Sequence, residues 1–332
     1  MGQLNMKYIV LDLEWNQCPS GKKYENPRLP FEIIEIGAVR LDEKFRIEGK
    51  FNRIIKPQVY KSIHYMTRQV INLTMNDLKE GLIFTEAIKE FFSWCGDDYV
   101  FCTWGSTDVT ELLRNMKFYG LEPVSQEPLK YYDIQKLFSL RYDDGKIKSN
   151  LKLAVERLGI EESMEYHSAF NDAWYTVQVM LNMDFESVKA NYSIDCFYIP
   201  HSRQDEVYAV FENYSKYISR GFTSREEMLK DREVTSMKCY KCGKRCRKKI
   251  RWFSGNNKTY YALAICNEHG LLKGKIRTRQ SIDDEYYAIK TLKLVTEEES
   301  VVIKDRQLQM RQKRRLKRER EKLKRTEELE SL

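Results

Sequence analysis

The chain has 332 residues, of which 42% are hydrophobic and 32% charged, and its formal net charge is +8. This composition is typical of a folded protein with a sizeable core, and it excludes a wholly disordered chain. No apolar run reaches the ~20 residues of a membrane-spanning helix, and the first strand begins directly after Met6, so we expect neither membrane association nor a signal peptide.

Residues 1–185 alternate predicted strands and helices. Apolar, β-branched runs predict strands over 8–14, 31–41, 49–56 and 98–104, and the first three of these form an antiparallel meander. Helical spacing of apolar residues predicts helices over 85–95, 108–119, 133–141, 150–158 and 169–183. This order of elements predicts an α/β domain in which helices flank a mixed sheet.

Three further segments follow this domain. Residues 186–232 are predicted to form a helical connector, residues 233–280 a cysteine-rich unit, and residues 281–332 a C-terminal segment with a basic helical tail. Twelve basic and three acidic residues lie between Lys304 and Arg325, an excess larger than that of the whole chain. The tail therefore predicts a polyanionic partner, although a solvated helix without a partner would have the same composition.

Acidic residues stand at the ends of several predicted elements. Asp12 and Glu14 are two residues apart on the first strand, so their carboxylates face the same side. Two such anions repel each other unless a cation lies between them, and the structural alternative is an exposed polar face of the strand. Asp108 begins a helix after the fourth strand, where it could also serve simply as a first-turn acid.

His167 and Asp172 surround the start of the last helix of this domain. Ser168 is predicted to cap that helix, which leaves His167 on the preceding loop and Asp172 about one turn inside. Asp172 lies in an otherwise apolar stretch, where an uncompensated carboxylate is costly. With the three acidic residues above, this pair could supply ligands for two divalent cations and one general base, as the hydrolysis of a phosphodiester requires.

These segments resemble the three motifs of the DEDD, or DnaQ-like, 3′–5′ exonuclease superfamily. The motifs are Asp12-Leu13-Glu14, Asp108 after Trp104-Gly105, and His167-x-Ala169-x-x-Asp172-Ala173. The histidine places the chain in the DEDDh subtype. Residues 35–39 (Glu-Ile-Gly-Ala-Val) are similar to the family's second strand, and residues 63–67 to its first-helix segment. The resemblance covers roughly residues 7–184 and implies a ribonuclease H-like fold.

The resemblance also implies a role for each motif residue. Asp12, Glu14 and Asp172 would bind one metal ion, and Asp12 would bridge to a second, which Asp108 would hold mainly through water. Oxygen ligands suit Mg²⁺ or Mn²⁺. His167 would be the general base, because an unperturbed imidazole titrates near neutral pH. The product would be a nucleoside 5′-monophosphate released from a 3′ end.

Four residues occupy places where the family contacts the terminal nucleotides: Trp15, Asn16, His64 and Met66. An aromatic side chain there could stack on a base, although Trp15 and Met66 could equally be core residues. Many proofreading members have a small residue in the place of Trp15. This departure favours the ribonuclease-like branches, and hence RNA over DNA.

Half of the cysteines lie in the cysteine-rich unit. Cys239-x-x-Cys242 and Cys266-x-x-His269 form two knuckles with 23 residues between them, which is typical of a zinc ribbon with one structural zinc. Free buried thiols are the alternative, and Cys246 is the ambiguous fifth candidate. Strands are predicted over 249–253 and 259–265, with a turn at 255–257. Clustered cysteines without a secretory signal predict metal ligands in a reducing compartment, the cytoplasm.

The sequence thus predicts a two-metal 3′–5′ exonuclease acting on single-stranded nucleic acid, with a ribbon and tail that raise affinity or contact a protein. One alternative is a non-catalytic adaptor that binds nucleic acid or a ribonucleoprotein through its C-terminal third. Another is a proofreading exonuclease bound to a polymerase. The complete set of five motif residues disfavours the adaptor, because an adaptor needs no metal ligands.

Overall fold

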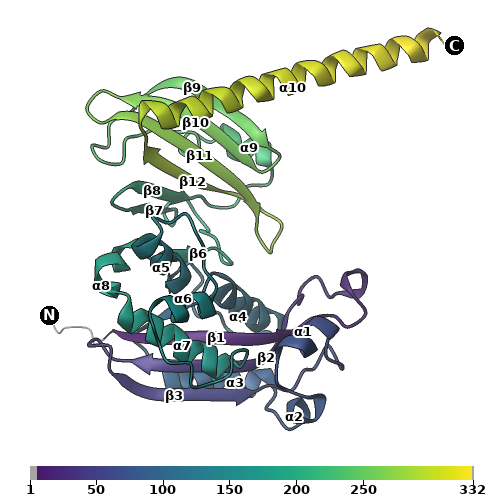
Figure 1. Cartoon of the computed structure of the whole chain (residues 1–332). Coiled ribbons are helices and arrows are strands. Elements are labelled where there is room, and N and C mark those ends of the chain that lie inside the picture. The colour runs from purple at the N-terminus through teal and green to yellow at the C-terminus, as the bar shows by residue number, and fades with distance from the viewer. Residues whose placement is uncertain (1–5, 331–332) are drawn as a thin grey trace. The chain divides into compact units, whose positions relative to one another are not determined.

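The computed structural model describes the backbone of residues 6–330 and the side chains of residues 6–322. The chain forms two compact units, residues 1–197 and 198–332, and each is described by itself (Figure 1). The predicted basic tail runs past residue 322, so the side chains of Lys324 and Arg325 lie outside the described part.

The first unit contains a sheet of six strands in the order β3-β2-β1-β4-β5-β6. The pairs β3–β2, β2–β1 and β5–β6 are antiparallel, whereas β1–β4 and β4–β5 are parallel. The sheet is therefore mixed, as predicted. The strands are β1 (Lys7–Asn16), β2 (Glu32–Leu41), β3 (Ile47–Ile54), β4 (Tyr99–Thr103), β5 (Leu129–Asp133) and β6 (Ser193–Asp195).

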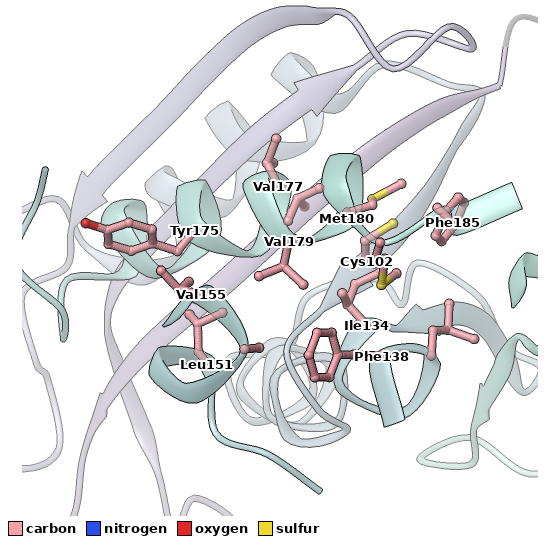
Figure 2. Close-up of a cluster of buried hydrophobic side chains, with 14 of the residues drawn as sticks. Cys102, Ile134, Phe138, Leu151, Val155, Tyr175, Val177, Val179, Met180 and Phe185 are labelled. Carbon is pink, nitrogen blue, oxygen red and sulfur yellow. The ribbon is translucent and has the colours of Figure 1, made fainter. Parts of the chain in front are cut away.

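Helices cover both faces of this sheet (Figure 1), which confirms the predicted α/β fold. Val10 on β1 and its partner Cys102 on β4 face the cluster in which α5, α6 and α7 pack (Figure 2). Ile9 and Phe101 face the other way, and Phe101 stacks on Phe91 of α3 with 6.3 Å between ring centroids. The helices are α1 (Tyr65–Val70), α2 (Met75–Lys79), α3 (Phe84–Cys95), α4 (Thr107–Phe118), α5 (Ile134–Tyr142), α6 (Leu151–Arg157), α7 (Ala169–Asn182) and α8 (Phe185–Val188).

Helix α7 approaches the sheet closely at Gly37 on β2. A Cβ atom there would lie 2.1 Å from the carbonyl carbon of Ala169 and from the nitrogen of Phe170, so a side chain would displace the helix. Gly37 is also the cross-strand partner of Asp12. The first turn of α7 is therefore held against β2, beside the strand that carries Asp12 and Glu14.

Two strands of the first unit, β5 and β6, are missing from the predicted order of elements. The five residues of β5 (Leu-Lys-Tyr-Tyr-Asp) and the three of β6 (Ser-Ile-Asp) contain no apolar run like the one that identifies β4, so the sequence pattern does not reveal them. The predicted boundary at residue 185 is also too early, because β6 pairs with β5 and the compact unit extends to Phe197.

The second unit contains an antiparallel sheet in the order β7-β8-β12-β11-β10-β9. The strands are β7 (Val207–Val210), β8 (Tyr214–Ile218), β9 (Arg247–Asn256), β10 (Thr259–Cys266), β11 (Gly270–Gln280) and β12 (Tyr286–Leu294). The two strands predicted for the cysteine-rich unit are present as β9 and β10. They do not form a separate domain, because β10 pairs with β11 and β11 with β12.

The prediction of a helical connector over 186–232 is wrong. This segment contains β6, β7 and β8, beside the short helices α8 and α9 (Arg225–Lys230). In β8, Ser215 and Tyr217 are buried while Tyr214 and Lys216 are half-buried. The strand period of two is present, but polar residues on both faces obscure it in the sequence.

The predicted helical tail is confirmed as α10 (Glu297–Glu330). Its beginning packs on the sheet, where Ile303 is 3% exposed and contacts a cluster that includes Ile250 and Leu263. From Arg311 to Lys322 every side chain is exposed, and the helix projects beyond the sheet (Figure 1). Among the described residues, no helix is long and apolar enough to cross a bilayer.

Candidate active site

Acidic side chains from three elements meet near the end of β1. Asp12 and Glu14 share the face of Val10, which α7 covers. Asp108 lies in the first turn of α4, and its carboxylate accepts the backbone N–H of Leu13. Asp172 lies in the first turn of α7. The fold thus brings together four carboxylates that are up to 160 positions apart in the sequence.

Burial and mutual repulsion raise the pKa of these carboxylates. Burial is the main reason that the pKa of Asp12 is well above its usual range, and the charges of its neighbours, chiefly Asp108, add to this. Burial also raises the pKa of Glu14 to about 8, that of Asp108 to about 7 and that of Asp172 to about 6. Near neutral pH the cluster would retain protons unless a cation neutralised it.

The donor atoms fit a divalent cation. Oδ1 of Asp172 is buried and has no hydrogen-bond partner among the described residues, a state that buried oxygens rarely adopt unless they bind an ion or water. One ligand atom each of Glu14, His167 and Asp172 lie within 4.8 Å of one another. Carboxylate oxygens are the hard donors that small divalent cations prefer. These side chains could therefore hold such a cation.

His167 lies on the loop before α7 and is exposed. Its φ of +67° is in the left-handed region, which few residues other than glycine adopt. Its backbone N–H donates to Oδ2 of Asp172, with 3.3 Å between nitrogen and oxygen. Asp172 thus holds the histidine loop with one oxygen while the other stays unpaired. The imidazole is placed beside the acidic cluster and open to water, as a general base requires.

Glu35 on β2 is a fifth carboxylate of this site. The sequence predicts only a strand at residues 35–39 and no role in the site for Glu35. It is the cross-strand partner of Glu14. Its two oxygens accept the Ser168 hydroxyl and the Ala169 N–H, each at 3.1 Å. Ser168 does not cap its own helix, contrary to the prediction, because β2 supplies the acceptor instead. A glutamate inside an apolar strand is the sequence signal that could have identified this residue.

Asn16 does not present a surface to a ligand, contrary to the prediction. It is fully buried, and its Nδ2 donates to the Ser62 carbonyl while its Oδ1 accepts the His64 N–H, both at 2.9 Å. Both polar atoms are therefore used to tie the segment before α1 to the end of β1.

The other three predicted contact residues lie at or near the surface. Trp15 is half-buried, with its ring 5.6 Å from that of Phe31. His64 caps α1, since its Nδ1 accepts the N–H of Met66. Met66 is 47% exposed and its neighbour Tyr65 is 66% exposed. The first turn of α1 therefore offers accessible side chains, and Asn16 connects this turn to the strand of Asp12 and Glu14.

The second unit contains a separate cluster of metal-binding side chains. Three sulfur atoms and one imidazole nitrogen, from Cys239, Cys242, Cys266 and His269, lie within 4.8 Å of one another. The closest pairs are separated by 3.6, 3.6 and 3.8 Å. Ligand atoms of a tetrahedral zinc site are roughly 3.5–3.8 Å apart, given bonds of about 2.0–2.3 Å. Cys246 is not in this group, and its thiol donates to a backbone carbonyl.

The turns that carry these ligands are formed by backbone hydrogen bonds. The Cys239 N–H donates to the Lys244 carbonyl at 2.9 Å, and Gly243, at φ +70°, donates to the Cys239 carbonyl at 2.7 Å. In the turn after β10, the backbone N–H of Glu268 is the main cause that lowers the pKa of Cys266 to about 6. A lowered pKa favours the thiolate, the form that binds metal.

A family model described as exonuclease (RNase T) matches residues 9–180. The chain is 22% identical over 182 residues to curated proteins named 3′-5′ exoribonuclease 1 from Rattus norvegicus and Mus musculus, covering 52% of this chain and 52% of each relative. The chain thus spans about half the length of the curated relatives it matches.

Solved structures with a similar fold include two nucleases. One is the nuclease domain of 3′hExo, a DEDDh family member, bound to rAMP, with 19% identity and a TM-score of 0.48, covering 59% of this chain and 98% of that one. The other is cell-death related nuclease 4, with 18% identity and a TM-score of 0.45, covering 55% of this chain and 65% of that one.

Proposed function

This chain belongs to the exonuclease family whose model matches residues 9–180, and on that premise we propose that it is a two-metal-dependent 3′–5′ exonuclease. Its substrate is single-stranded nucleic acid, and its product is a nucleoside 5′-monophosphate. The observation that carries this proposal is the convergence of four acidic side chains from β1, α4 and α7 beside an exposed histidine.

The acidic residues hold the two cations, which we propose to be Mg²⁺ or Mn²⁺ because the donors are carboxylate oxygens. Asp12, Glu14 and Asp172 would hold the first, and Asp12 and Asp108 would hold the second. When bound, the cations stabilise the charge that develops on the phosphate during an in-line displacement. The unpaired Oδ1 of Asp172 supports its assignment as a ligand.

His167 removes the proton from the attacking water. The oxygen of this water forms a bond to phosphorus as the bond from phosphorus to the 3′ oxygen breaks. The 3′ oxygen takes up a proton from solvent as it leaves, so the shortened strand ends in a 3′ hydroxyl, and the released nucleotide keeps its 5′ phosphate. The exposure of His167 supports this role, because a base must pass its proton on to solvent before the next turnover.

We propose that RNA is preferred over DNA. The curated relatives from rat and mouse are named exoribonucleases, and Trp15 stands beside Glu14 where many proofreading enzymes have a smaller residue. The first turn of α1, with His64 and the exposed Met66, would contact the terminal nucleotides.

We also propose one structural zinc ion, bound by Cys239, Cys242, Cys266 and His269. The separations of their ligand atoms support a closed tetrahedral site with no position for a substrate. None of the eight cysteines, all of which the structure describes, forms a disulfide, which suits a reducing compartment such as the cytoplasm.

The test is to incubate the purified full-length protein with 5′-labelled RNA and DNA of the same sequence, in Mg²⁺ or Mn²⁺. We expect a ladder of products shortened from the 3′ end, faster with RNA, together with nucleoside 5′-monophosphates. Full-length substrate in both metals, with the oligonucleotide nevertheless bound, would favour the non-catalytic adaptor instead.

A further inference from the structure

The sheet of the second unit has one packed face and one that is only partly covered. Alternate side chains along each strand point to the packed face. They form two apolar clusters with the segment 222–240 and include Leu272, Ile276, Ala288 and Leu292. The side chains between them on β11, β12 and β8 lie on the opposite face. On that face α10 covers the edge at β9 and β10 through Ile303.

The uncovered part of this face is basic. Its cations come from three adjacent strands, and we call them the basic face: Lys273, Lys275 and Arg277 on β11, Lys293 on β12 and Lys216 on β8. The strand register aligns them in rows. In one row, Lys273 on β11 is the cross-strand partner of Lys293 on β12. In the next row, Lys275 on β11 has Tyr261 of β10 on one side and Thr291 of β12 on the other. Thr291 is in turn the partner of Lys216 on β8.

The three cations on β11 are not compensated by acids on the same face. Among the described side chains, no carboxylate lies within ion-pair distance of Lys273, Lys275 or Arg277, whereas Lys293 is 3.8 Å from Glu299. Like charges that face each other across strands destabilise a sheet. Partial burial, and then the charges of Arg277, Lys273 and Arg306, lower the pKa of Lys275. The arrangement therefore favours an anion.

The helix beside this face continues the positive charge. Arg306 lies 4.6 Å above the ring of Tyr261, which is the cross-strand partner of Lys275. Further along α10, five cations gather on one side around Glu319: Arg311, Arg314, Arg315, Arg318 and Lys322. Cations are thus present from β8 across the sheet and outward along the helix.

We propose that the basic face, together with Arg306 of α10, forms a docking surface for the phosphate backbone of single-stranded nucleic acid. The proposal rests on the proposed function for the class of its partner. The positive charge of this surface is complementary to the negative charge of the phosphates. The spacing of the cations also supports the proposal, because Lys273, Lys275 and Arg277 follow one another at intervals of two residues, ~6.8 Å along the strand. A polymer with one charge per nucleotide can follow such a row. The surface contains no catalytic residue, so it contributes affinity and not chemistry.

The test compares two triple variants of the full-length protein, both made in an Asp12→Asn background so that the probe stays intact. One is Lys273→Gln/Lys275→Gln/Arg277→Gln. The matched control is Lys248→Gln/Lys249→Gln/Arg251→Gln, which removes the same charge from exposed positions on β9. The probe is 5′-labelled oligouridylate, and its binding is measured by fluorescence anisotropy across a salt series.

We expect the basic-face variant to bind about tenfold more weakly and to flatten the salt slope by about 2, because each contact to a single strand contributes about 0.7. The control should stay near the parent protein. Thermal melting should show no loss of stability in the basic-face variant, since it removes repulsion. Equal weakening in both variants would mean that net charge alone matters, and would overturn the proposal.

Two further measurements separate this proposal from others. Turnover of a dinucleotide, measured with Asp12 intact, should be unchanged in the basic-face variant, and its loss would assign these residues to the active site instead. Binding to phosphatidylserine vesicles in place of oligouridylate would assign the surface to a membrane and overturn the proposal. If the parent protein hydrolyses nothing, the proposed function fails, whereas the anisotropy series still tests the surface.

Discussion

The two units of this chain both collect like charges, and they do so under opposite conditions. In the first unit, carboxylates are buried at the end of a central strand, and burial raises the pKa of Glu14 to about 8. In the second, cations lie on a sheet face where water reaches them, and Arg277 and Lys293 are exposed. Buried like charges must protonate or bind a counter-ion, whereas exposed ones are screened and persist.

This difference indicates how each unit would meet a nucleic acid. The buried carboxylates change protonation state unless cations are bound, so the first unit is suited to chemistry that depends on metal. The cations of the second unit lie where water and salt reach them, so this unit is suited to salt-sensitive attraction. The following predictions test this contrast, from the largest expected effect to the smallest.

Loss of zinc should affect the second unit alone. Structural zinc contributes on the order of 10 kcal/mol to the folding of zinc-finger peptides, and this unit, which also has apolar clusters, should lose roughly 5 kcal/mol. We expect Cys266→Ser to lose the bound zinc and the hydrogen-exchange protection of β9–β11, while β1 and β2 stay protected. Cys246→Ser is the matched control, because it changes a thiol outside the ligand group. Equal zinc content in both variants would contradict the assignment.

Replacement of Asp12 should affect chemistry and not folding. We expect Asp12→Asn to reduce turnover by roughly 10³-fold, the scale of losing a group that stabilises charge in the transition state. Its melting temperature without metal should be equal or higher, because a buried carboxylate that its neighbours repel is removed. The exposed Asp97 provides the control, since Asp97→Asn should alter neither quantity. Full activity in Asp12→Asn would refute the proposed function.

Without divalent metal, the protein should become less stable as pH rises from about 4 to 8. The folded-state pKa values of Glu14, Asp108 and Asp172 are raised, to about 8, 7 and 6. The folded state therefore binds more protons than the unfolded state in this window, and rising pH removes that advantage, by a few kcal/mol. Melting curves across this range, with and without Mg²⁺, measure it. Metal should reverse the trend, and Glu14→Gln should flatten it. A pH-independent metal-free protein would contradict the buried cluster.

Glu35 should contribute less than the metal ligands, because it acts through α7. Glu35→Gln keeps one acceptor oxygen for the two donors at Ser168 and Ala169. We expect kcat to fall about tenfold, or ~1.4 kcal/mol, with a smaller change in KM and in metal affinity. Glu35→Asp should retain less than half of the kcat of the parent protein, since the shorter aspartate side chain does not reach both donors. A loss that appears only in melting temperature would assign Glu35 a purely structural role.

The sequence predicts the first unit well because its elements carry local patterns. The strand of Asp12 is a continuous apolar run, and α7 has a clear apolar face, so both the fold class and the motif order follow from the residues. The short strands β5 and β6 could not be identified, since they exist only through pairing with strands distant in sequence. The tyrosine-rich β8 was obscured for a different reason, because polar residues lie on both of its faces.

The site residues also divide into those that a local sequence pattern predicts and those that it does not. The spacing of Asp12 and Glu14 on one strand predicts that they share a face, and the knuckle spacing predicts the cluster of Cys239, Cys242, Cys266 and His269. No local pattern could reveal that Glu35 accepts hydrogen bonds from the start of α7, or that Asn16 is fully buried. Both depend on which segments the fold places side by side.

The smallest effect is expected at the first turn of α1. Met66 is 47% exposed and makes few contacts that the fold needs, so Met66→Ala should leave the melting temperature unchanged. If its side chain packs against a terminal nucleotide, KM should rise a few-fold, somewhat less than the ~1–3 kcal/mol of an aromatic stack, with kcat retained. Asn16→Ala supplies the contrast. It leaves the Ser62 carbonyl and the His64 N–H without partners, so it should lower the melting temperature and raise KM together. If Met66→Ala lowers stability as much as Asn16→Ala does, Met66 is a core residue, and the substrate contacts must be sought at Tyr65 or Trp15.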